Sequence, residues 1–321
     1  MALCLAGLSS CTSSARLGQW AGPQVPVGAS ASQWSYLDKP AKCLNSPHYR
    51  IYTTLEDRQT LELLPQLLEG ALSRYRQLVP DLPLSDRPME CYIFRSRTEW
   101  DAFTRHRTGP DATVYLQIRS GGYTVGDTFV SYFIGEQNTF SVCGHEGWHQ
   151  FCGRHFKGRL PPFLEEGLAC MFESVNWDGQ LPRFNTSVNP YRASSIRRAI
   201  ERNSLWPLEK LIATHAGDIV SQPMDRIDAF YGQSWAFARF LWEGENGRYR
   251  AAMQRWITQT AQGTVHDPSY SHTRAGLPWN RRAVKGIIEH YLQTDLATLD
   301  KAFSAYMRKI AFEELSAQYR S

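Results

Sequence analysis

Residues 145–149 read His-Glu-Gly-Trp-His, and residues 160–169 read Leu-Pro-Pro-Phe-Leu-Glu-Glu-Gly-Leu-Ala. The first stretch is an H-E-x-x-H motif, and positions four apart on an α-helix lie on the same face, one turn apart. His145 and His149 can therefore direct both imidazoles at one metal ion. Glu146 lies about 100° round the helix from His145. Its carboxylate is thus placed beside the open coordination position, where it suits a general base better than a ligand.

Two imidazoles do not complete a catalytic zinc site, which usually has three protein ligands and a fourth position for water. The two stretches together resemble the gluzincin metallopeptidases, in particular the bacterial peptidase MA-like family, in which H-E-x-x-H precedes W-L-x-E-G-x-A. The resemblance implies that the third ligand is the glutamate before Gly-x-Ala, which is Glu166, 17 residues after His149. A connection of this length permits an antiparallel second helix. We therefore expect Zn²⁺ to be bound by His145, His149 and Glu166.

His155 is a rival third ligand, because it follows His145 by ten residues, as in the metzincin pattern H-E-x-x-H-x-x-G-x-x-H. That pattern requires glycine at a turn position where this chain has Cys152, and the glycine follows one residue late at Gly153. A non-glycine residue in a left-handed turn costs roughly 1 kcal/mol or more. We therefore favour Glu166 as the ligand and interpret His155 as a loop histidine.

The resemblance to the peptidase MA-like family extends from about His48 to Trp242. Members often carry Tyr-x-Gln-Ser-Trp-Ala after the glutamate ligand, and residues 231–236 read Tyr-Gly-Gln-Ser-Trp-Ala. Tyr231 could then act in catalysis by donating a hydrogen bond to the oxyanion of the tetrahedral intermediate. An amphipathic helix with its aromatic residues packed in the core explains the same segment equally well.

Glu173 lies two helical turns beyond Glu166 and on the same face, so it is a candidate to accept a hydrogen bond from a histidine ring. A solvated surface carboxylate is an equal alternative for this residue. His215 and His290 are weaker candidates for the site, because a lone histidine is more often structural or exposed.

The motifs predict a zinc metallopeptidase that hydrolyses peptide or protein substrates. Zinc lowers the pKa of bound water from 15.7 to about 7, and Glu146 would accept the proton and pass it to the leaving amine. Residues 128–134, TFVSYFI, are expected to form the sheet edge along which an extended substrate pairs. The alternative is a non-catalytic, gluzincin-like zinc-binding or interaction module of the cell envelope. Glu146 argues against it, because a structural zinc ion needs no base.

Hydrophobic periodicity predicts an α+β chain, in which a small mixed sheet with helices precedes a mainly helical C-terminal region. The resemblance implies a zincin-like arrangement with the H-E-x-x-H helix at the junction. After Gly135 the β signals stop. The expected strands are residues 48–54, 89–94, 112–118 and 128–134, and the expected helices include residues 61–78, one that starts after Ser96, and residues 191–203, 225–243 and 298–315.

The composition is that of a globular protein, with 42% hydrophobic and 21% charged residues. The net charge of +4 is spread along the chain, so nucleic acid is not an expected partner. The seven cysteines include no C-x-x-C pair and predict no zinc cluster. Small buried core residues are the favoured interpretation of the three that flank the motifs, Cys143, Cys152 and Cys170.

The first residues, MALCLAGLSSC, resemble a bacterial lipobox that ends in a lipid-modified Cys11. This predicts an exported lipoprotein of the cell envelope, on the periplasmic side. A Ser- and Ala-rich disordered terminus of a cytoplasmic protein is the alternative. We expect residues 1–40 to form this segment and a flexible linker, residues 41–175 to form the α+β part with the metal site, and residues 176–321 to form a helical part.

Overall fold

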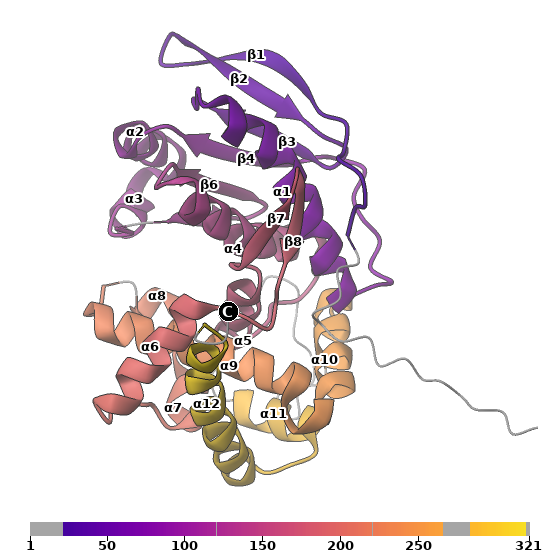
Figure 1. Cartoon of the computed structure of the whole chain (residues 1–321), viewed down its shortest axis with the longest axis vertical. Coiled ribbons are helices and arrows are strands. Elements are labelled where there is room, and N and C mark those ends of the chain that lie inside the picture. Colours follow the sequence, from indigo (N-terminus) through magenta and orange to yellow (C-terminus); the bar gives the residue numbers. More distant parts are fainter. Residues whose placement is uncertain (1–21, 120, 220, 266–282, 319–321) are drawn as a thin grey trace, which may run out of the picture.

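The computed structural model describes residues 22–119, 121–219, 221–265 and 283–318 (Figure 1). A six-stranded mixed sheet comes first, and most of the later residues form helices, so the predicted α+β class is confirmed. Within the described residues, none of the helices is both long and apolar enough to cross a membrane. The predicted lipid anchor, Cys11, lies outside the described residues.

The sheet has the strand order β1-β2-β3-β4-β6-β5. The pairs β3–β4 and β4–β6 are parallel, and the pairs β1–β2, β2–β3 and β5–β6 are antiparallel. Alternation of buried and exposed positions sets the register, as in β3, where Tyr49, Ile51 and Thr53 are buried. The strands are β1 (Ser30–Tyr36), β2 (Lys39–Asn45), β3 (Tyr49–Thr53), β4 (Met89–Phe94), β5 (Gly122–Val125) and β6 (Thr128–Tyr132).

The expectation of a flexible linker through Pro40 is wrong for residues 30–40. They belong to the β1–β2 hairpin, whose two-residue turn has positive φ at Leu37 (50°) and Asp38 (57°). Positive φ at both turn positions matches the twist of the flanking strands. Trp34 of β1 packs against Tyr52 of β3, with ring centroids 5.3 Å apart. This aromatic contact between strands anchors a segment whose Ser- and Ala-rich composition suggested a tether.

Three further strand predictions are wrong. Residues Ala112–Tyr115 form the short helix α3, which continues from a 3-10 turn at Gly109–Asp111, so the β-branched residues there do not mark a strand. The partner of β6 is instead the glycine-initiated strand β5, so the predicted edge strand β6 lies between β4 and β5. The edge of the sheet next to β6 is therefore β5. A second hairpin, β7 (Val175–Asp178) with β8 (Leu181–Phe184), also shows that strands continue after Gly135.

The first two helices of the chain are those that the hydrophobic pattern and the capping signal at Ser96 predict. Helix α1 (Arg58–Leu78) covers the predicted segment, and α2 (Arg97–Thr108) starts after Ser96, whose hydroxyl accepts the Glu99 N–H at 3.3 Å. Helices α1 and α4 (Glu136–His155) contact one face of the sheet, and α2 contacts the other. The remaining helices are α5 (Pro162–Met171), α6 (Pro190–Glu201), α7 (Leu208–Ala213), α8 (Ala216–Ile219), α9 (Met224–Gly247), α10 (Arg250–Gln262), α11 (Val284–Leu292) and α12 (Leu296–Gln318).

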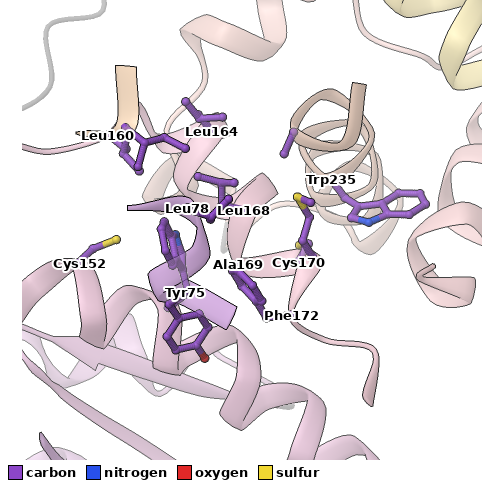
Figure 2. Close-up of a cluster of buried hydrophobic side chains, with 14 of the residues drawn as sticks. Tyr75, Leu78, Cys152, Leu160, Leu164, Leu168, Ala169, Cys170, Phe172 and Trp235 are labelled. Atoms are coloured by element: carbon purple, nitrogen blue, oxygen red, sulfur yellow. The ribbon is translucent and has the colours of Figure 1, made fainter. Parts of the chain in front are cut away.

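Helix α4 is fixed to its neighbours by a buried aromatic contact and a hydrogen bond. Tyr75 of α1 is fully buried and donates its hydroxyl to the Gly144 carbonyl at 2.6 Å. Its ring packs edge-on against Trp148 of α4 and against Phe172 at the end of α5, at centroid distances of 5.7 and 4.7 Å. Figure 2 shows Tyr75 and Phe172 among the buried hydrophobic side chains of this region. One tyrosine thus holds the H-E-x-x-H helix and the end of α5 together.

Helix α5 packs closely against α9 at Gly167. A Cβ atom at this position would lie 2.2 Å from the Ser234 carbonyl oxygen and 3.1 Å from the Ala238 Cβ. Only glycine therefore allows α5 to approach α9 this closely. The residue before it is Glu166, so the contact between α5 and α9 also fixes the position of this expected ligand relative to α4.

Gly167→Ala should destabilise the protein, because the added methyl group must push α5 away from the α9 backbone. We expect the free energy of unfolding to fall by about 1–3 kcal/mol, the usual cost of overpacking. Denaturant unfolding followed by circular dichroism measures it. Gly28→Ala is the matched control, because nothing lies within 4 Å of a Cβ there. Equal midpoints for both variants would contradict the packing role of Gly167.

Candidate metal centre

The candidate site lies where α4 and α5 meet. Helix α4 ends at His155, and α5 starts at Pro162, preceded by Pro161. Proline suits the first turn of a helix, because its fixed φ is helical and it has no N–H to satisfy there. The short loop therefore ends in a residue that favours the start of a helix, and α5 returns along α4.

The side chains of His145, His149 and Glu166 converge on one point. The two Nε2 atoms are 3.3 Å apart, and Glu166 Oε2 lies 3.2 Å from Nε2 of His145 and 3.4 Å from Nε2 of His149. Ligands at the usual zinc distances of about 2.0–2.1 Å in a tetrahedron are roughly 3.3–3.4 Å from one another. The three observed separations therefore match three corners of a tetrahedral zinc site.

The chemistry of this group also fits a cation. Glu166 Oε2 is buried and, within the described part of the chain, makes no hydrogen bond of acceptable geometry. Buried polar atoms are normally satisfied, so an orphaned carboxylate oxygen needs an explanation. A divalent cation among the three atoms would satisfy it. His145, His149 and Glu166 would hold the metal.

Two further carboxylates orient the imidazoles. Nδ1 of His145 lies 2.9 Å from Glu173 Oε1, and Nδ1 of His149 lies 3.0 Å from Glu165 Oε1. An ionised carboxylate only accepts hydrogen bonds, so each Nδ1 carries a proton, and a neutral ring in this orientation presents the lone pair of Nε2 to the common point. This is the usual arrangement around histidine ligands, where an outer acceptor fixes ring orientation and tautomer. Of the two interpretations of Glu173, the hydrogen-bond acceptor is the one found.

Glu173 is itself held by a buried cation. Arg192 donates Nη2 to Oε1 at 2.6 Å and Nε to Oε2 at 2.9 Å, and Asn189 donates Nδ2 to Oε2 at 2.7 Å. Both partners come from the start of α6, where Asn189 is also the N-cap. The chain from Arg192 through Glu173 to His145 therefore connects α6 to the metal-ligand group.

The pKa values around the ligands favour positive charge at the histidine pair. Burial lowers the pKa of His149, but the negative charge of Glu166, the contact with that carboxylate and the hydrogen bond to Glu165 outweigh burial and raise the pKa to about 10. Burial also raises the pKa of Glu166, but the positive charges of His149 and His145 and their contacts with the carboxylate together outweigh burial, so the pKa of Glu166 lies well below its usual range. The glutamates thus create a field that a divalent cation would neutralise.

Glu146 is buried beside this group but is not one of the converging atoms. Thr124 of β5 donates its hydroxyl to Glu146 Oε2 at 2.8 Å. The ring of Tyr231 of α9 lies near the His145 ring, with centroids 6.1 Å apart, and the Arg192 guanidinium lies 5.0 Å from the Tyr231 centroid. The structure therefore brings all five predicted site residues to one place.

The rival ligand His155 is elsewhere. Its Nδ1 bonds the Phe151 carbonyl at 3.0 Å, and its Nε2 accepts the Ser85 N–H at 3.3 Å. Neither it nor His215 nor His290 belongs to a group of metal-ligating atoms found among the described residues. The structure therefore supports Glu166 over His155.

Cys170 is closer to the site than its sequence interpretation implied. Its Sγ lies 3.9 Å from Nδ1 of His145. The five cysteines in the described part of the chain are buried free thiols. Burial raises the pKa of the Cys170 thiol to about 11, so it stays neutral and packs as a core residue.

The sequence interpretation missed four residues around the site: Thr124, Glu165 as a hydrogen-bond acceptor, Asn189 and Arg192. Glu165 carried a signal, since it precedes Glu166 and lies at the start of the same helix. Thr124, Asn189 and Arg192 carried none, because only the folded chain brings them to α4.

No protein-family model, curated protein or solved structure matches this chain. The geometry of the metal-ligand group is therefore what supports the function proposed below.

Glu166→Ala should abolish stoichiometric zinc binding, because two imidazoles alone make a weak site, whereas His155→Ala should keep it. Elemental analysis of the purified proteins after dialysis against zinc measures the metal content. The opposite pattern would favour the metzincin-type ligand set. His155→Ala is also the control, because it removes a histidine from α4 without removing a proposed ligand.

Glu165→Ala should weaken zinc binding by about 10–100-fold, the usual effect of removing an outer acceptor from a histidine ligand. Glu165→Gln retains an acceptor oxygen and should stay within a few-fold of the unmodified protein. A competition titration with a chromogenic chelator gives the affinities. Glu165 is suited to this test because His149 is its hydrogen-bond partner and its side chain is 23% exposed, so the fold should tolerate the change. Equal affinities for all three proteins would refute the orienting role.

Proposed function

We propose that this protein is a zinc-dependent metallopeptidase of the gluzincin type that hydrolyses peptide bonds. The observation that carries the proposal is the convergence of His145, His149 and Glu166 at zinc-like separations beside a carboxylate, Glu146, that is not one of the three. A purely structural zinc site is usually closed by four protein ligands. Three ligands with an adjacent base are the arrangement of a hydrolytic site.

The placement of α4 supports a zincin-like arrangement. The helix contacts β5 and β6 of the sheet on one side and α5 on the other, so the motif lies between the strands and the later helices. The ligand from α5 and the aromatic side chain from α9 then reach the same site from the helical side.

Zn²⁺ held by the three ligands would lower the pKa of a water molecule and polarise the scissile carbonyl. Glu146 would accept the proton from that water as it attacks, and then deliver it to the leaving amine. Its carboxylate is suited to this transfer because Oε2 is held by Thr124. Oε1 has no hydrogen-bond partner in the described parts of the chain, so it is available to the water.

Tyr231 would stabilise the oxyanion of the tetrahedral intermediate. Burial, with the nearby charge of Glu166, raises the pKa of its phenol well above the usual value, so the hydroxyl remains a donor at neutral pH. Its ring packs on Arg192 and at the edge of Phe230, with centroid distances of 5.0 and 5.3 Å. These contacts hold the ring in one orientation next to His145.

The free edge of the sheet supports an extended peptide as the substrate. Strand β5 is the outer strand, and its residues contact α4. An exposed edge offers main-chain donors and acceptors to an added strand. The pairing that the sequence placed on residues 128–134 thus belongs on β5. A lipobox at Cys11 would put this activity on a cell-envelope lipoprotein, which stays a prediction.

Glu146→Gln should retain zinc and lose peptidase activity by about 100-fold or more, because the amide is isosteric but cannot accept the proton. Cleavage of casein and of a quenched-fluorescent peptide library measures activity, and elemental analysis confirms the metal content of each sample. Equal cleavage by both zinc-loaded proteins would contradict the catalytic proposal. A zinc-loaded protein that cleaves nothing would favour the alternative of a non-catalytic zinc-binding module.

A further inference from the structure

Thr124 of β5 contacts the general base of the proposed reaction with its side chain. The hydroxyl lies 2.8 Å from Glu146 Oε2 and 3.1 Å from the Glu146 carbonyl oxygen. A hydroxyl has one proton to donate, and a carboxylate oxygen is a stronger acceptor than a carbonyl oxygen, so the Thr124 hydroxyl donates to Glu146 Oε2. The carboxylate of Glu146 is thus tied to the sheet as well as to its own helix.

The main chain of Thr124 faces the other way. Strands β5 and β6 are joined by the two-residue turn Gly126–Asp127, and Val125 pairs with Thr128 to close the hairpin. In an antiparallel pair, hydrogen-bonded and non-hydrogen-bonded positions alternate. The closing pair of a two-residue turn is hydrogen-bonded, so the next pair, Thr124 with Phe129, is not. The N–H and C=O of Thr124 therefore point away from β6, toward the free edge.

We propose that Thr124 is a positioning residue that fixes the carboxylate of Glu146 relative to the substrate-pairing edge of the sheet. The proposal rests on the proposed peptidase function. Through its hydroxyl, Thr124 holds Oε2 and leaves Oε1 of Glu146 to accept the proton. Through its main chain, the same residue offers a donor and an acceptor to an extended substrate. One residue thus sets both the orientation of the base and the register of the scissile bond.

The surroundings of Thr124 make its position well defined. The neighbouring residue Tyr123 points to the opposite face of the sheet, where it is buried and donates its hydroxyl to Thr104 at 3.1 Å. Tyr123 also packs against Trp100 of α2, with ring centroids 5.5 Å apart. Because successive side chains alternate between faces, anchoring Tyr123 on the α2 side directs Thr124 at α4.

Replacing Thr124 tests the hydroxyl without touching a ligand. Thr124→Val keeps the shape but loses the donor, so kcat should fall by about 10–100-fold, the cost of a misplaced reacting group. KM should change little, because the main-chain groups at the edge remain. Thr124→Ser restores the hydroxyl and should return kcat to within a few-fold of the unmodified enzyme. The zinc content of all variants should be equal. If the valine variant does not fold, Thr124→Ala takes its place.

A double-mutant cycle separates this proposal from the peptidase proposal. If Thr124 acts through Glu146, then Thr124→Val should have no further effect on the residual rate of Glu146→Gln. An active enzyme that Glu146→Gln inactivates but whose kcat is unchanged by Thr124→Val would overturn the role of Thr124 alone. A fall in the rate that serine does not rescue would also overturn it. A zinc-loaded protein that cleaves no peptide would overturn both proposals.

Discussion

Three atoms with lone pairs, two imidazole nitrogens and one carboxylate oxygen, are held within 3.4 Å of one another, and the rest of the structure has to maintain this contact. Such atoms repel one another unless a cation or shared protons lie between them. The packing of the surrounding helices holds the three atoms at this distance. Tyr75 ties α4 to α1 and contacts the end of α5, and Gly167 lets α5 lie against the α9 backbone. The well-packed apolar core therefore holds these three polar atoms close enough to share one cation.

Four glutamates lie around this point, and their contacts are of three kinds. Glu166 converges with the histidines, whereas Glu165 and Glu173 accept hydrogen bonds from the far side of the rings. Glu146 accepts a hydrogen bond from a strand and faces no imidazole at bonding distance. Side chains of one chemical type thus make different contacts in one small region, and the roles proposed for them follow from those contacts.

The parts of the site that are local in sequence could be predicted, and those that depend on long-range packing could not. The i, i+4 spacing of His145 and His149 is a property of one helix, and the placement of Glu166 followed from a resemblance to a known second motif. Thr124 and Arg192 reach the site only through a hairpin and through α6, and no local pattern encodes that arrangement. The fold shows the same limit. The sequence predicts long amphipathic helices such as α1 correctly. It does not predict the short strand β5, and it wrongly predicts a strand at Ala112–Tyr115, which is helical, because tertiary contacts override weak β signals in such short segments.

The buried pair of Arg192 and Glu173 is better explained by geometry than by stability. Burying two charges has a desolvation cost that their attraction does not always exceed, and apolar replacements of buried ion pairs are often neutral or stabilising. An apolar pair here would leave Nδ1 of His145 without an acceptor and free its ring to rotate. Arg192 also packs on the ring of Tyr231, so the same guanidinium contacts both the Glu173 carboxylate and the Tyr231 ring. A cation that is costly to bury is thus placed where it fixes the orientation of His145, through Glu173, together with that of Tyr231.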